Sequence, residues 1–179
     1  MKISILSALI LILLACAGQP PSDFITGIPE NEITLAEAAT TPAQYEQSIV
    51  RWGGRVIKAE VIVGSAVDAG LLRVEIIDYP LDEKGKPLDD ANAGTRFIAY
   101  LEAGDKTLEA LKSSVFKRNA FVTVVGRLNG IESVGLDNGQ IQRLVVVDAE
   151  HYHRWAYHNN HSRPNNHGFS FGIGIGVTL

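Results

Sequence analysis

Apolar and polar positions alternate in the middle of the chain. Leu72, Val74 and Ile76 alternate with Arg73 and Glu75, and a period of two is typical of a strand with one buried face. Apolar segments rich in β-branched residues predict four further strands, at residues 50–63, 96–101, 121–128 and 141–149. The chain is therefore expected to be mainly β.

Glycines mark the expected bends and turns. Gly53 and Gly54 lie near the start of the first predicted strand, where a strongly curled strand needs a bend or a positive φ. We interpret them as backbone devices rather than a phosphate cradle, because no helix N-terminus follows them. Asn-Gly pairs at 129–130 and 138–139 predict hairpin turns, since these residues adopt positive φ angles readily.

Two short helices are expected between and before these strands. Thr34 as N-cap and Glu37 three residues later form a capping-box pattern at the start of a helix over residues 34–40. A second helix, over residues 105–114, is predicted because Leu108 and Leu111 lie three positions apart, which places them on one face of a helix. It falls between the third and fourth strands.

The order β-β-β-α-β-β predicts an all-β fold of a specific kind. A curled first strand, five strands in all and a short helix between strands 3 and 4 is the layout of an OB-like five-stranded Greek-key barrel. Closure would also protect strand edges that an open sheet exposes. A small open antiparallel sheet with a covering helix is the alternative.

Residues 1–15 predict a lipoprotein signal peptide. The apolar run is too short to span a bilayer but fits a secretory signal. Leu13, Ala15 and Cys16 match the bacterial lipobox, in which the cysteine becomes the lipidated N-terminus. Several acyl chains on Cys16 would anchor the protein stably. An ordinary signal peptide with an incidental cysteine is the alternative.

The mature chain divides into three parts by composition. Residues 16–33 are small, polar and proline-bearing and predict a linker without a fixed fold. Residues 34–150 form the expected OB-like domain, and residues 151–179 a His-rich and then Gly/apolar tail. The net charge of −4 argues against general nucleic-acid binding, which needs clustered cations. The single cysteine excludes a disulfide framework within the chain.

The order of several short motifs resembles one family. Together with the lipobox, the motifs are Pro42-Ala43-Gln44-Tyr45, Arg51-Trp52-Gly53-Gly54, Tyr79-Pro80-Leu81-Asp82, Val122-Thr123-Val124-Val125-Gly126 and Arg154-Trp155. In this order they resemble the Slp family of starvation-inducible outer-membrane lipoproteins. The resemblance implies a small, palmitate-bearing lipoprotein of the Gram-negative envelope, associated with starvation, and it brings no catalytic residues.

No residue set predicts an enzyme. The chain lacks a nucleophile elbow, a zinc-protease motif, a Walker loop and a dinucleotide-binding loop. Tyr45 and Trp52 are candidate ligand-facing aromatics, with packing at the end of the barrel as the alternative. Arginines on the predicted strands can contact anionic lipids or glycans, or serve only as solubilising charges.

The histidines supply the one candidate metal site. All five follow Glu150: His151, His153, His158, His161 and His167. A His-rich tract can bind Zn²⁺, Ni²⁺ or Cu²⁺, and the alternative is a solvated tail whose histidines only titrate. Beyond them, residues 168–179 alternate apolar with small residues, like one transmembrane strand. A single strand must pair with another chain, pack on its own barrel or remain at the interface.

These patterns together predict an outer-membrane-anchored periplasmic lipoprotein that acts as an envelope binding or support module without catalysis. Its expected partners are the membrane, through the lipid on Cys16, and a second envelope protein, but no nucleic acid. No cofactor is expected apart from that covalent lipid. The alternative is a periplasmic metal-binding lipoprotein that uses the histidine tail.

Overall fold

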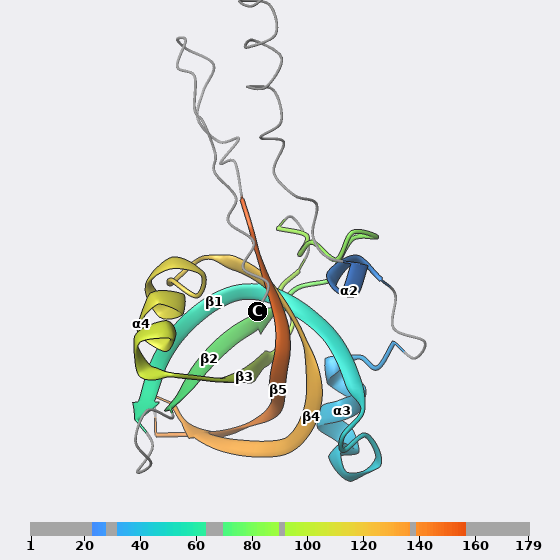
Figure 1. Cartoon of the computed structure of the whole chain (residues 1–179). Coiled ribbons are helices and arrows are strands. Elements are labelled where there is room, and N and C mark those ends of the chain that lie inside the picture. The colour runs from blue at the N-terminus through green and yellow to red at the C-terminus, as the bar shows by residue number, and fades with distance from the viewer. Residues whose placement is uncertain (1–22, 28–31, 64–69, 90–91, 137–138, 157–179) are drawn as a thin grey trace, which may run out of the picture.

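The computed structural model describes residues 23–27, 32–63, 70–89, 92–136 and 139–156. Five strands form a closed barrel in the order β1-β2-β3-β5-β4 (Figure 1). Their bounds are β1 Ile49–Val63, β2 Gly70–Asp78, β3 Arg96–Ala103, β4 Phe121–Gly135 and β5 Ile141–Trp155. The predicted barrel is confirmed, and the open sheet is wrong.

The strand pairing is that of a Greek key. All neighbours are antiparallel except β3 and β5, which run parallel from Phe97 opposite Val145. The long β1 pairs with β4 through its first half and with β2 through its second half. Gly54 and Arg55 pair with both neighbours, and a register shift between Val56 and Lys58 lies just beyond them, within the ladder of β1 and β2.

Residues from every strand fill the barrel with one apolar core. Fully buried members include Val56, Leu72, Val74, Phe97 and Val122. In β2 the apolar members occupy the alternate positions that the sequence pattern assigns to a buried face. The predicted inward-facing side of β2 is therefore confirmed.

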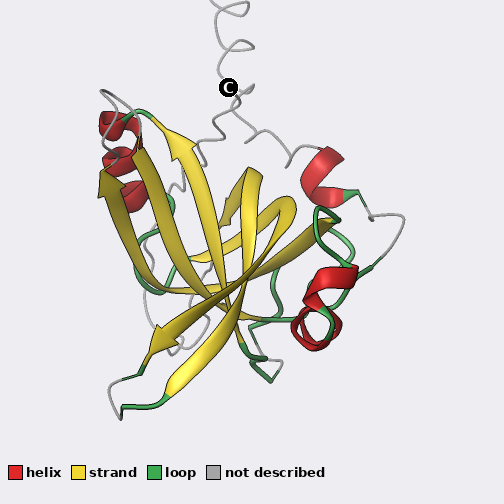
Figure 2. Ribbon diagram, turned by 90° about the horizontal axis from the view of Figure 1, so that it is seen from below, coloured by secondary structure: helices red, strands yellow, loops and turns green. Residues whose placement is uncertain are grey.

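Helix α3, Leu35–Thr40, and helix α4, Asp105–Ser114, pack on the barrel (Figure 2). Thr34 caps α3, with its hydroxyl accepting from the Glu37 backbone and the Glu37 carboxylate accepting from the Thr34 backbone. The predicted capping box is confirmed. Helix α4 has the predicted bounds and buries Leu108 in the core. A 3-10 turn, η2 at Pro42–Gln44, connects α3 to β1.

Strands β4 and β5 are longer than predicted. Gly130 has a φ of +77°, but it lies within β4, where the register shifts between Leu128 and Ile131. The predicted hairpin turn at 129–130 is therefore wrong, because a positive φ serves a β-bulge as well as a turn. Gly139, with a φ of +79°, lies in the turn between β4 and β5.

Part of the predicted linker is folded. Helix α2, Asp23–Thr26, lies against β4 and β5, and Ile25 is only 2% exposed. The expectation that residues 16–33 lack a fixed fold is wrong for this turn, because one apolar side chain finds a buried position on the barrel. None of the helices in the described residues is long and apolar enough to cross a membrane.

Candidate functional site

Residues from three distant motifs meet on the outer face of β1, β4 and β5. The register places three residues of β1 opposite three of β4, which in turn pair with three of β5. We call this set the capped face: Arg51, Gly53, Arg55, Phe121, Thr123, Val125, His151, His153 and Trp155. Since β5 continues to Trp155, residues 151–155 belong to the barrel and not to the tail.

Two segments cover this face. They are α2 and the loop at residues 79–88, and we call them the cap (Figure 1). Tyr79 packs edge-on against Phe121, with ring centroids 5.7 Å apart. Gly85 lies against Ile25 of α2, so that a β-carbon at Gly85 would approach the Ile25 carbonyl oxygen to 2.4 Å. The two parts of the cap are therefore packed on each other as well as on the sheet.

Thr123 lies at the centre of the capped face and is fully buried. Its Oγ1 accepts a hydrogen bond of 2.9 Å from the indole Nε1 of Trp155 and donates one of 2.5 Å to the Gly85 carbonyl oxygen. One hydroxyl thereby joins β4, β5 and the cap. A buried hydroxyl with both functions satisfied stabilises the packing around it, whereas an unpaired one would destabilise it.

The paired glycines are required by close packing. A β-carbon on Gly53 would lie 2.8 Å from Thr123 Oγ1 and 3.0 Å from Leu81 Cδ2. A β-carbon on Gly54 would lie 1.8 Å from the Ile77 carbonyl oxygen. Neither glycine has a positive φ, so the expectation that a positive φ requires glycine at these positions is wrong. The absent side chains let the cap and β2 approach β1.

Arg51 holds α2 in place. Its Nη1 donates to the Ile25 carbonyl oxygen at 3.1 Å and to that of Gly27. These carbonyls lie at the C-terminal end of α2, where helical hydrogen bonding leaves acceptors unsatisfied. The Arg51 Nε is buried and has no hydrogen-bond partner in the described part of the chain. The guanidinium is thus committed to the cap.

The candidate ligand-facing aromatics lie against the core. Trp52 is 6% exposed, packs edge-on against Phe97 and donates from Nε1 to the Ile33 carbonyl oxygen at 2.8 Å. Tyr45 is partly buried against the same cluster. A ligand approaching from solvent would meet little of the Trp52 ring, so stacking on that ring would require the barrel end to open.

Two of the five histidines predicted as metal ligands lie in the part of the chain that the structure describes. His151 and His153 lie on the same side of β5, with the His151 ring 4.2 Å from that of Phe24 and the His153 ring 4.5 Å from that of Trp155. Burial lowers the pKa of His153. The other candidate ligands, His158, His161 and His167, and the lipidation residue Cys16 lie outside the described residues. Within the described ranges, no three His, Cys, Asp or Glu residues form a metal-binding group.

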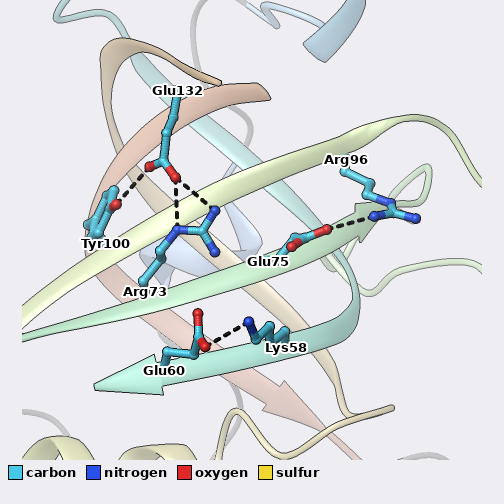
Figure 3. Close-up of polar contacts among 7 residues, drawn as sticks. All are labelled: Lys58, Glu60, Arg73, Glu75, Arg96, Tyr100 and Glu132. Atoms are coloured by element: carbon cyan, nitrogen blue, oxygen red, sulfur yellow. Dashed lines mark hydrogen bonds and ion pairs between the residues drawn. The ribbon is translucent and has the colours of Figure 1, made fainter. Parts of the chain in front are cut away.

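A second polar cluster lies on the outer face of β2 and β3 (Figure 3). Arg73 donates from Nε and Nη2 to Glu132 Oε1 at 3.0 and 2.9 Å, and Tyr100 donates to Glu132 Oε2 at 2.7 Å. Arg96 pairs with the buried Glu75 at 2.9 Å. Sequence reasoning missed Glu132 and Tyr100, because no local pattern shows which distant strands will face each other.

This pairing decides what the β2–β3 face can bind. OB-type barrels commonly bind oligonucleotides or oligosaccharides there, using free cations and aromatics. Here both arginines are neutralised by carboxylates. Beside them, Ile98, Leu144 and Val146 form a small apolar cluster that includes part of the β4–β5 hairpin. The face is therefore largely engaged with the protein itself.

Comparison with known proteins gives a family and several structural neighbours. The sequence model of the outer membrane lipoprotein Slp family matches residues 13–172. No curated protein sequence matches the chain.

Solved structures similar to the barrel include single-stranded DNA-binding proteins. One is the small protein of this type from Streptomyces coelicolor, with 15% identity, covering 60% of this chain and 94% of that one, at a TM-score of 0.38. Another is the mitochondrial protein from S. cerevisiae, with 13% identity, coverages of 61% and 95% and a TM-score of 0.36. A third, from Plasmodium falciparum in complex with single-stranded DNA, has 12% identity, coverages of 58% and 88% and a TM-score of 0.31.

The family match includes the residues of the lipobox, and it extends across the capped face to the end of β5. The resemblance drawn from the short motifs is thereby confirmed. The chain belongs to the outer membrane lipoprotein Slp family.

Proposed function

We propose that this lipoprotein is anchored through acylated Cys16 on the periplasmic face of the outer membrane and acts there as a starvation-associated binding or support module. The family supports the outer-membrane location. The expected partners are the membrane and a second envelope protein. Neither catalysis nor nucleic-acid binding is part of this proposal.

The commitment of the motif residues to packing carries the proposal. Thr123, Trp155 and Arg51 are hydrogen-bonded to one another or to the cap, and the arginines of the β2–β3 face are paired with carboxylates. Catalytic groups need a reacting atom within reach and a protonation state suited to the task. A barrel whose polar groups serve its own packing is better suited to holding a position in the envelope than to turning over a substrate.

Anchoring is tested with Cys16→Ser. Intact-mass analysis of the mature wild-type protein should show acylation, and Cys16→Ser should remain unprocessed or be misrouted in membrane fractionation. An unmodified Cys16 thiol in the mature wild-type protein would refute the anchor.

Orientation is tested by protease treatment of intact and outer-membrane-permeabilised cells. A protein on the periplasmic face should be digested only after permeabilisation. Digestion in intact cells would place it on the outer surface and overturn this part of the proposal.

Metal binding remains a second candidate, favoured by one observation. His151 and His153 are alternate residues on the same side of β5, so two imidazoles, a ligand type that suits Zn²⁺, Ni²⁺ and Cu²⁺, share one face of the strand. The remaining ligands would come from His158, His161 and His167. Catalysis is not required of such a site.

The structure determines how metal binding should be tested. Deleting residues 151–167 would remove the end of β5, so loss of binding could reflect unfolding. Substituting His158, His161 and His167 by Ala changes no residue of the described barrel. Calorimetric titration with Zn²⁺ should show stoichiometric uptake by the unlipidated wild-type protein and a loss of at least tenfold in affinity in the triple variant. Equal weak uptake by both proteins would exclude the site.

A further inference from the structure

Two exposed apolar side chains lie on the two segments of the cap. Phe24 of α2 is 47% exposed, and Leu88 at the end of the loop is 38% exposed. The segments are packed on each other, as the contact of Gly85 with Ile25 shows. Figure 1 also places α2 next to this loop. The apolar side chains therefore belong to one side of the molecule.

Covalent geometry keeps this side close to the lipid. Asp23, the first residue of α2, follows Cys16 by seven residues. A fully extended chain covers at most about 3.6 Å per residue, so α2 lies within about 25 Å of an acylated Cys16. The β4–β5 hairpin, by contrast, lies away from α2 in both views (Figure 2).

The orientation of Phe24 relative to the barrel is fixed. Its ring rests on that of His151, the neighbouring Ile25 is buried, and Arg51 holds the carbonyls at the end of the helix. A bilayer attached through the chain before α2 therefore meets a preorganised surface. Preorganisation lowers the entropic cost of a contact, and attachment raises the effective concentration of the two surfaces.

The charges of the cap are mixed. Lys84 and Lys86 on the loop are accompanied by Asp82 and Glu83, and α2 contributes Asp23. The Asp82 carboxylate accepts hydrogen bonds from the backbone of both lysines. Since no net positive charge results, the surface is suited to apolar contact with lipid rather than to electrostatic attraction.

We propose that the cap is the membrane-contacting surface of the protein, with Phe24 and Leu88 at the phospholipid headgroup and acyl boundary and the β4–β5 hairpin directed into the aqueous space. The proposal rests on the lipid anchor at Cys16 and adds an orientation of the barrel to it. The partner is a phospholipid bilayer. The contact adds to the anchor and does not replace it.

Site-directed spin labelling of the lipidated protein tests the orientation. Acylation blocks the thiol of Cys16, the only native cysteine, so Phe24→Cys, Leu88→Cys and the control Ile141→Cys each supply one free thiol. Ile141 is 75% exposed at the start of β5. Each labelled protein is incorporated into vesicles of phosphatidylethanolamine and phosphatidylglycerol, and accessibility to oxygen is compared with accessibility to an aqueous nickel complex.

Labels at 24 and 88 should show an oxygen-to-nickel accessibility ratio several-fold above that at 141, and 1 M salt should leave the difference in place. Equal ratios at the three positions would overturn the orientation. Intact mass reports separately whether Cys16 is acylated, so failure of the anchor is distinguished from failure of the contact. Equal melting temperatures of the three labelled proteins and wild type show that the barrel is intact.

Discussion

The indole Nε1 of Trp155 donates a hydrogen bond of 2.9 Å to Thr123 Oγ1. Trp155 is the last residue of β5, and Thr123 is the third residue of β4. The same hydroxyl donates to the Gly85 carbonyl oxygen at 2.5 Å. The end of the last strand is thus connected through one buried hydroxyl to the loop that covers the capped face, and the loop in turn supports α2.

Replacing Thr123 by Val should destabilise the protein by about 1–3 kcal/mol, because the indole N–H and the Gly85 carbonyl both lose a partner in a buried position. Urea unfolding of the unlipidated protein measures the free energy of unfolding. Thr123→Ser is the matched control, since it retains the hydroxyl and removes only a methyl group. If Val and wild type have the same stability, the hydroxyl has no structural role.

Gly54→Val should be among the most destabilising substitutions in the chain, at about 3 kcal/mol, because the added β-carbon meets the Ile77 carbonyl oxygen at 1.8 Å and the two strands must separate. Gly135→Val is the control, since nothing lies within 4 Å of its added β-carbon. Thermal and urea melts compare the two. Equal effects at both positions would contradict the close approach of β1 and β2.

Asp78→Asn should stabilise the protein at neutral pH. Asp78 lies at the end of β2 opposite Gly54, and burial raises the pKa of its carboxyl from 3.8 to about 6. A raised pKa means that its contribution to stability is complete below pH 3.8 and is lost as pH rises through about 6. Asn should restore roughly 1–2 kcal/mol at pH 7.5, and little at pH 4. Urea unfolding at both pH values checks this, and a gain of the same size at both would refute it.

His153→Gln should reduce the loss of stability in mild acid. Burial lowers the pKa of His153 from 6.5, so the unfolded chain binds this proton more readily than the folded one, and stability is lost as pH falls below about 6.5. The comparison is best made in the Asp78→Asn background, because ionisation of Asp78 acts in the opposite direction over an overlapping range. Unfolding midpoints between pH 7.5 and 5 that shift equally with and without His153 would contradict this assignment.

The secondary structure was largely predictable because its signals are local. The alternation of Leu72, Val74 and Ile76 marks a buried strand face whatever the strand contacts. The capping box of Thr34 and Glu37 joins residues three positions apart. The bounds of α4 followed from short-range apolar spacing in the same way.

Features that depend on distant contacts could not be predicted. Glu132 and Arg73 are 59 positions apart, and only the register of the hairpin brings them together. The positive φ of Gly130 was predicted correctly, but it serves a β-bulge within β4 and not the predicted hairpin turn. The pairing with β5 decides between these two structures. The end of β5 looked like the start of a tail because its histidines are not typical strand residues.

By itself the sequence determined the barrel, the helices α3 and α4 and, through the order of its motifs, the family. Only the tertiary structure decided what those motifs do together. Arg51 donates a hydrogen bond to α2, and the absence of a side chain at Gly53 leaves room for the loop of the cap. Thr123 connects that loop to Trp155 through its hydroxyl. The physical reason is that strand and helix propensities act over a few residues, whereas burial and hydrogen-bond satisfaction depend on which distant segments exclude water from one another.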